Sequence, residues 1–199
     1  MHATAGTYHR APSLITHLIA AEAEGEKLST DELIGTCVLL LNAGHEATVH
    51  SLGNAVACLL SHDAPIAALA PDRIGETVEE LLRYDPPLHM FTRYAYEDID
   101  LGDVTLPKGA QIALMLGAAG RDPAVYDAPD RFDPTRPAKP HVAFGGGLHF
   151  CVEAPLARLE LQIALPALFM TLPNMRLAAP PRSANASPFH KLDKLMITP

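Results

Sequence analysis

Several features that would assign this sequence to a protein class are scarce or missing. Tryptophan is absent, and only three cysteines occur in 199 residues, with no C-x-x-C pair among them. Cysteines this widely spaced disfavour a zinc site or a disulfide framework, and they fit a reducing compartment. The 15 basic residues are outnumbered by 23 acidic ones, giving a formal net charge of -8. That balance argues against a nucleic-acid partner.

Long hydrophobic stretches are also lacking. The strongest apolar run, around residues 37–41, is too short to cross a bilayer, and no basic segment followed by an apolar one opens the chain. We therefore expect a cytoplasmic protein without a membrane partner. Hydrophobic residues still make up 48% of the chain, which is enough for a globular domain with a core.

Helical patterns dominate the chain. A capping box, Ser29-Thr30-Asp31-Glu32, predicts the start of a long helix over residues 30–61. The middle of that helix is apolar on every side, so we expect it to be buried. Hydrophobic periodicity and turn residues predict three shorter helices, three strands and a proline-rich meander. The helices are expected at residues 13–24, 72–84 and 154–172, the strands at 90–95, 104–106 and 111–116, and the meander at 121–141. The predicted fold class is mainly α with a minor β patch.

The most informative segment is Phe144-Gly145-Gly146-Gly147-Leu148-His149-Phe150-Cys151, which precedes an apolar helical run. Glycines allow strained backbone conformations, so this loop can fold tightly beneath a flat group. Backbone N–H groups of the loop and the following helix N-terminus can stabilise a thiolate on Cys151. A lone thiolate of this kind suits axial ligation of haem iron. The alternative is an inert cysteine buried at a helix start.

Two further segments place polar groups among apolar ones. The long helix contains Ala43-Gly44-His45-Glu46-Ala47-Thr48, where small residues leave room for a flat ring and an acid stands in an apolar run. A kinked helix with a solvated glutamate is the alternative. Glu80 and Arg83 lie three residues apart, close enough to pair on one helix face. Their apolar neighbours favour burial over a surface ion pair of little energetic value.

Taken in order, these segments resemble the motifs of cytochromes P450. The cysteine loop, residues 144–151, is similar to F-x-x-G-x-H/R-x-C-x-G, and Glu80-Leu81-Leu82-Arg83 is similar to E-x-x-R. Pro129-Asp130-Arg131-Phe132 resembles P-E/D-R-F, and residues 43–48 resemble the oxygen-activating helix. The resemblance extends from about residue 14 to residue 199. It implies the C-terminal portion of the cytochrome P450 fold, with residues 1–199 as one partial domain and the family's N-terminal half absent.

The resemblance implies haem b as the cofactor, with Cys151 as the metal ligand. Arg93 and His149 match contacts to the haem propionates. Glu46 matches the catalytic acid, and Thr48, one residue beyond the family's threonine position, is a second catalytic candidate. The other residues implied at the cofactor are Ala43, Gly44, Phe144 and Gly145. A structural triad is implied for Glu80, Arg83 and Arg131, with Arg136 as a second candidate for its third member.

Two positions depart from the family pattern. Ala47 follows Glu46 where the family usually has a threonine that takes part in proton delivery, and Thr48 lies about 100° further around the helix. Glu153 stands two residues after the cysteine, where the family has a glycine that packs against the haem.

The function implied is that of a haem-thiolate monooxygenase of secondary metabolism, acting on a small apolar organic substrate. A ferredoxin or a reductase would donate the electrons, with Arg158 as a candidate contact. The alternative is a non-catalytic relic or helper protein that keeps the fold without turnover. Ala47, Glu153 and the missing half favour that alternative, whereas Cys151, Glu80 and Arg83 favour the enzyme.

Overall fold

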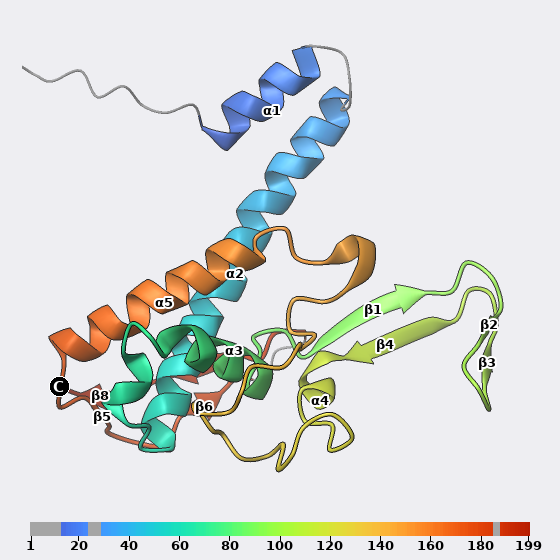
Figure 1. Ribbon diagram of the computed structural model, residues 1–199. Helices are drawn as coiled ribbons and strands as arrows, with labels where there is room; N and C mark the ends of the chain where they lie inside the picture. The colour runs from blue at the N-terminus through green and yellow to red at the C-terminus, as the bar shows by residue number, and fades with distance from the viewer. Residues whose placement is uncertain (1–12, 24–28, 185–187) are drawn as a thin grey trace, which may run out of the picture. The chain divides into compact units, whose positions relative to one another are not determined.

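The structure, a computed structural model, describes residues 13–23, 29–184 and 188–199, which divide into two compact units. The first unit ends at His45 and the second begins at Glu46. Helices predominate, accompanied by short strands (Figure 1). No helix in the described part of the chain has the length and hydrophobicity needed to cross a membrane.

The first unit holds α1 (Leu14–Ala23) and the beginning of α2 (Thr30–Ser61). The bounds of α2 are those predicted, and the predicted capping box forms at its start. The Ser29 amide donates to the Glu32 carboxylate at 2.8 Å, and the Glu32 amide donates to the Ser29 hydroxyl at 3.3 Å. The end of the predicted helix 13–24 lies outside the described residues.

The predicted burial of α2 is confirmed in its C-terminal part but not in its middle. Within the second unit, Val56 and Leu59 are buried. Earlier in the helix, Leu33 is buried, whereas Val38, Leu39 and Leu41 are exposed. A helix that is apolar all round needs cover on every side, and the described residues do not supply it for these three side chains.

The core of the second unit joins the end of α2 to two other helices, α3 (Ile74–Tyr84) and α5 (Ala154–Thr171). Val78 of α3 and Leu161 and Leu165 of α5 are almost completely inaccessible to solvent. A 3-10 turn, η1 (Ile66–Leu69), packs against both helices. The sequence predicted this second helix, α3, over residues 72–84. It begins at residue 74 instead, because residues 71–73 form a turn.

The β patch is an antiparallel hairpin of β1 (Met90–Tyr94) and β4 (Gln111–Met115), in which Met90 pairs with Met115 and Tyr94 with Gln111. Its connection carries a small second pair, β2 (Ile99–Asp100) with β3 (Thr105–Leu106), of which β2 was not predicted. A short helix, α4 (Leu116–Ala119), follows β4.

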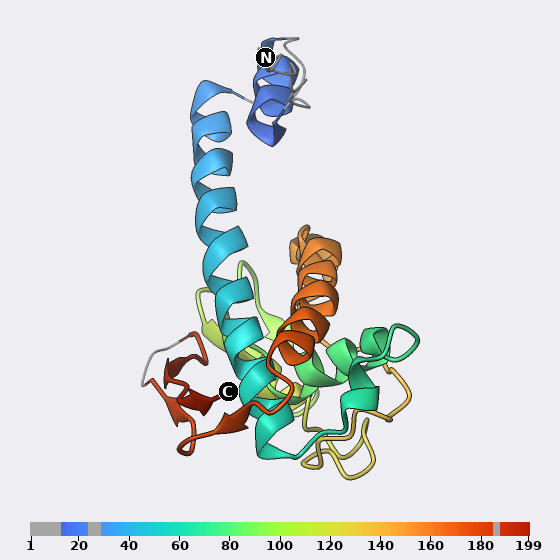
Figure 2. The same cartoon turned by 90° about the vertical axis from the view of Figure 1, so that its left-hand side faces the viewer.

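The C-terminal segment forms two further strand pairs. These are β5 (Arg176–Leu177) with β8 (Ile197–Thr198), and β6 (Arg182–Ser183) with β7 (Leu192–Lys194). The side-chain amide of Asn54 donates to the carbonyl of His190 at 2.9 Å, and Leu195 packs against the core. This segment therefore lies beside the C-terminal part of α2 (Figure 2).

Candidate functional site

The loop that carries Cys151 is held in a tight turn at the start of α5. Gly145 and Gly147 have φ angles of 72° and 65°, in the left-handed region that a Cβ atom disfavours. The Cys151 amide donates to the Phe144 carbonyl at 3.0 Å and closes the loop. The Cys151 sulfur makes no hydrogen bond to any described residue, so the expectation that backbone N–H groups point at it is wrong. The sulfur is left available to a ligand.

Large apolar side chains around Cys151 are exposed to solvent. Leu148, Phe150 and Val152 flank the cysteine in sequence, and all three are exposed. Covering apolar surface is favourable by roughly 25 cal/mol per Å². One sulfur donor surrounded by uncovered apolar side chains fits a large flat metal macrocycle better than it fits a hydrated ion.

The two residues expected at the haem propionates both have hydrogen-bonding capacity left. Arg93 is partly buried on β1, where its guanidinium donates to the Thr92 carbonyl at 2.9 Å and lies over the Phe91 ring. Within the described ranges no carboxylate pairs with it. His149 is exposed in the cysteine loop. Both side chains are thus free to bind an anionic group.

Glu80 and Arg83 form the buried pair that was predicted. Arg83 Nε donates to Glu80 Oε2 at 2.7 Å and Arg83 Nη2 donates to Oε1 at 2.8 Å, with both side chains at most 3% exposed. The remaining Arg83 N–H groups donate to the carbonyls of Gly120, Pro129 and Arg131. Every donor of the guanidinium therefore has a partner, which a buried charge requires.

The prediction that Arg131 completes this triad is wrong. Its guanidinium pairs with Asp133 and is 70% exposed. The third member of the network is Arg136, the second candidate, whose Nε lies 3.3 Å from Glu80 Oε1 and whose side chain is 12% exposed. The meander turns at residues 133–136, so Arg136 points towards α3, and Arg131 contributes only its carbonyl oxygen.

Gly120 is a residue of this network that sequence reasoning missed. Its carbonyl accepts a hydrogen bond from Arg83 at 2.7 Å, and a Cβ atom at this position would lie 2.4 Å from the Arg83 carbonyl oxygen. The φ of Gly120 is -65°, which any residue can adopt, so its conformation does not require glycine. The close approach of the two backbones does. A lone glycine after a strand pattern carries no sequence signal of this kind.

A second ion-pair cluster, also missed, ties the cysteine loop to α3. Glu79 Oε1 lies 2.5 Å from Arg158 Nε on α5, and Glu79 Oε2 lies 3.1 Å from His141 Nε2. The Ala143 amide donates to His141 Nδ1, so the neutral ring carries its proton on Nε2 and donates it to Glu79. The Arg158 guanidinium also covers the Phe144 ring at 4.6 Å. Arg158 therefore has an internal partner.

The charge on Glu79 is strongly favoured in the folded protein. Burial alone would raise the pKa of this carboxyl group, but the hydrogen bonds from His141 and Arg158 outweigh burial and lower the pKa to about 2. Glu79 is therefore ionised at neutral pH, and it binds the end of the meander and α5 to α3.

The residues of the predicted oxygen-activating segment belong to different units. Ala43 is exposed and Gly44 partly buried in the first unit. In the second, Glu46 is 46% exposed and lies 3.4 Å from His50 and 3.6 Å from Lys191. The acid is thus both hydrated and paired, which offsets its place in an apolar run. The Thr48 hydroxyl, also in the second unit, has no hydrogen-bond partner in the part of the chain described.

Glu153 fits its backbone position without strain. Its φ and ψ angles of -91° and 5° are accessible to residues other than glycine, and it occupies the N-cap of α5. The helix begins at Ala154, whose amide donates to the Cys151 carbonyl at 3.3 Å. An acid at a helix N-terminus is favoured by the helix dipole.

Comparisons with known proteins agree with this geometry. The cytochrome P450 family model matches residues 74–199. The "Biotin biosynthesis cytochrome P450" of Bacillus subtilis (strain 168) is 46% identical over 172 residues, which cover 85% of this chain and 43% of that protein. Cytochrome P450 107B1 of Saccharopolyspora erythraea is 47% identical over 171 residues, covering 84% of this chain and 42% of that protein. The chain thus spans less than half the length of these relatives.

Solved structures show the same likeness. Mycobacterium smegmatis CYP164A2 with econazole bound superposes with a TM-score of 0.89 at 44% identity, covering 95% of this chain and 48% of that one. P450BioI in complex with a hexadecenoic acid-ligated acyl carrier protein gives a TM-score of 0.84 at 45% identity, covering 90% and 47%. The predicted C-terminal portion of the P450 fold is confirmed by these superpositions.

Proposed function

This chain belongs to the cytochrome P450 family, whose cofactor is haem b, and from that premise we propose that it holds the haem through the Cys151 thiolate as part of a monooxygenase. The observation that carries the proposal is the cysteine loop. Gly145 and Gly147 adopt left-handed conformations, the Cys151 amide closes the turn on Phe144, and the sulfur is without a hydrogen-bond partner among described residues. Residues 1–199 would then form one partial P450 domain.

The residues of this chain have distinct proposed roles around the cofactor. Bound haem b supplies an iron that activates dioxygen with electrons from an external donor. Cys151 would hold that iron through its thiolate, and Arg93 and His149 would bind the haem propionates. Phe144 and Gly145 would shape the loop that carries the cysteine. The Glu79–Arg158–His141 cluster and the Glu80–Arg83–Arg136 network keep the loop in place.

Proton delivery is the role proposed for Glu46 and Thr48. The Glu46 side chain is 46% exposed, and the Thr48 hydroxyl has no hydrogen-bond partner within the described structure. Ala47 has only a methyl group at the intervening position and cannot donate a hydrogen bond.

We expect Thr48→Ala to lower the amount of product formed per reducing equivalent consumed by severalfold, because without the hydroxyl more of the dioxygen that is reduced, by two electrons and two protons, would leave as hydrogen peroxide. Peroxide and product are measured together at equal haem content. Ser51→Ala, one turn away on α2, is the control. An unchanged product ratio in Thr48→Ala would assign proton delivery to Glu46 and water alone.

The substrate is proposed to be a small apolar organic molecule of secondary metabolism. Names of relatives support this class: they include "Vitamin D(3) 25-hydroxylase" and "6-deoxyerythronolide B hydroxylase". The electron donor is proposed to be a ferredoxin or a reductase. Arg158 is not proposed as a contact for the electron donor, because its guanidinium pairs with Glu79. The comparisons do not favour the alternative of a non-catalytic helper protein.

The carbon monoxide difference spectrum of the reduced full chain tests haem-thiolate binding directly. A thiolate ligand shifts the Soret band well to the red of its position with histidine ligation, and we expect this signature in the wild type. Cys151→Ser should abolish it, whereas Cys58→Ser, at a buried cysteine of the core, should leave it intact. Retention of the red-shifted band in Cys151→Ser would overturn the assignment.

A further inference from the structure

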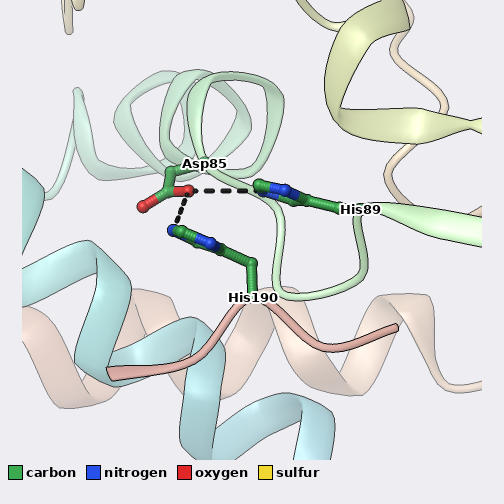
Figure 3. A group of neighbouring side chains, drawn as sticks. All are labelled: Asp85, His89 and His190. Atoms are coloured by element: carbon green, nitrogen blue, oxygen red, sulfur yellow. Dashed lines mark ion pairs between the residues drawn. The ribbon is translucent and has the colours of Figure 1, made fainter. Parts of the chain in front are cut away.

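Three side chains outside the cysteine loop and the two ion-pair networks converge at the end of α3. Asp85 follows the last residue of α3, His89 lies just before β1, and His190 lies between β6 and β7 (Figure 3). Asp85 Oδ1 is 3.2 Å from His190 Nε2 and 3.7 Å from His89 Nε2. The two imidazole rings stack, with centroids 4.2 Å apart and planes 7° from parallel.

Backbone hydrogen bonds bring the two histidines together across 101 positions of sequence. The His89 amide donates to the Pro188 carbonyl at 3.2 Å, and the His190 amide donates to the Pro87 carbonyl at 2.8 Å. Leu88 and Phe189 form an antiparallel bridge between these bonds. The main chain on both sides is therefore fixed before any ligand binds, which lowers the entropic cost of binding.

The charge of this cluster is unbalanced. Among the described residues, Asp85 forms ion pairs with the two histidines and with no lysine or arginine. Imidazole nitrogen and carboxylate oxygen are both good ligands for transition metals.

We infer that Asp85, His89 and His190 bind a divalent first-row transition-metal ion of the Zn²⁺ type. Zinc lies about 2.0–2.2 Å from nitrogen and oxygen ligands, so neighbouring tetrahedral ligand atoms are about 3.3 Å apart. The observed separations of 3.2 and 3.7 Å bracket this value, and all three ligand atoms lie within 4.8 Å of one another. Rotation of the two stacked imidazole rings would aim both Nε2 atoms at one ion beside Asp85 Oδ1.

The side chains of Asp85 and His190 are 27% exposed and that of His89 is 41% exposed, so an ion has access from solvent. Three protein ligands leave a fourth position for water. A bound ion would connect the end of α3 to the C-terminal segment, since it bonds to residues of both. The inference does not depend on haem binding, because none of the three residues belongs to the cysteine loop.

Isothermal titration of Zn²⁺ into the full chain, after removal of metals with a chelator, tests the site. We expect one ion per chain with micromolar or tighter affinity. His89→Ala, His190→Ala and Asp85→Asn should each weaken the affinity at least tenfold. His17→Ala, at an exposed histidine of α1, should leave it unchanged.

Two further measurements distinguish this site from zinc binding at the cysteine loop or scattered over the surface. Cys151→Ser should bind Zn²⁺ as the wild type does, because no thiolate takes part. Saturating Zn²⁺ should raise the melting temperature of the wild type but not that of His89→Ala, whose removed side chain is the most exposed of the three. The inference would be overturned if the wild type did not bind zinc, or if Cys151→Ser lost the binding. It would also be overturned if His89→Ala and Asp85→Asn both weakened the zinc affinity by less than tenfold.

Discussion

Replacing Arg83 by alanine is expected to lower the free energy of unfolding by about 3–5 kcal/mol, the cost of breaking a buried ion pair by removing one partner. The substitution leaves the Glu80 carboxylate almost completely buried with its two strongest bonds lost. It also removes the donor shared by the carbonyls of Gly120, Pro129 and Arg131. Urea unfolding followed by circular dichroism measures the change.

Arg131→Ala is the matched control for that experiment. Arg131 lies in the same meander, but its side chain is 70% exposed and, among the residues described, pairs with Asp133 alone. We expect its stability change to stay within about 0.5 kcal/mol, as is usual for surface substitutions. If Arg131→Ala were as destabilising as Arg83→Ala, the assignment of Arg136 as the third member of the network would be wrong.

Glu79→Gln is expected to lower the free energy of unfolding at pH 7 by about 1.5–3 kcal/mol, the range for a hydrogen bond to a charged group. The pKa of Glu79 is depressed from its ordinary value of 4.5 to about 2 in the folded protein. Its contribution is therefore fully present above pH 4.5 and is lost as the pH falls from 4.5 towards 2. Glutamine cannot ionise, so the difference between the wild type and the variant should narrow across that window.

Urea unfolding at several pH values between about 2 and 7 measures this narrowing. Glu76→Gln is the control, since Glu76 pairs with Arg73 on the surface of the same helix, with side chains 44% and 38% exposed. Surface pairs contribute about 0–1 kcal/mol, so this variant should stay close to the wild type at pH 7. A constant difference between Glu79→Gln and the wild type at all pH values would show that Glu79 does not titrate as inferred.

Local patterns predicted most of the helices and the motif residues. The capping box at Ser29 and Glu32 placed the start of α2, and the i, i+3 spacing of Glu80 and Arg83 placed their ion pair. Each of these interactions joins residues within one helical turn, so the spacing in the sequence already determines the distance in space.

Interactions that depend on the path of a loop were not predictable in this way. The motif in the sequence favoured Arg131 over Arg136 as the partner of Glu80, and the turn between them decides that Arg136 is the one that reaches it. Glu79 and Arg158 are 79 positions apart, with no motif that links them. Likewise, the sequence showed that α2 needs cover without showing which part of it the described residues bury.

The Arg83 guanidinium holds the meander by main-chain oxygens rather than by side chains. A carbonyl oxygen is present whichever residue occupies its position, so changes of side chain at Pro129 or Arg131 leave an acceptor in place. Inserting or deleting one residue between positions 120 and 131 would instead shift the main chain. A different carbonyl, or no carbonyl, would then lie within hydrogen-bonding distance of the guanidinium. The meander is therefore constrained in length far more than in composition, and homologous chains that anchor it in the same way should differ there by substitution and keep the spacing.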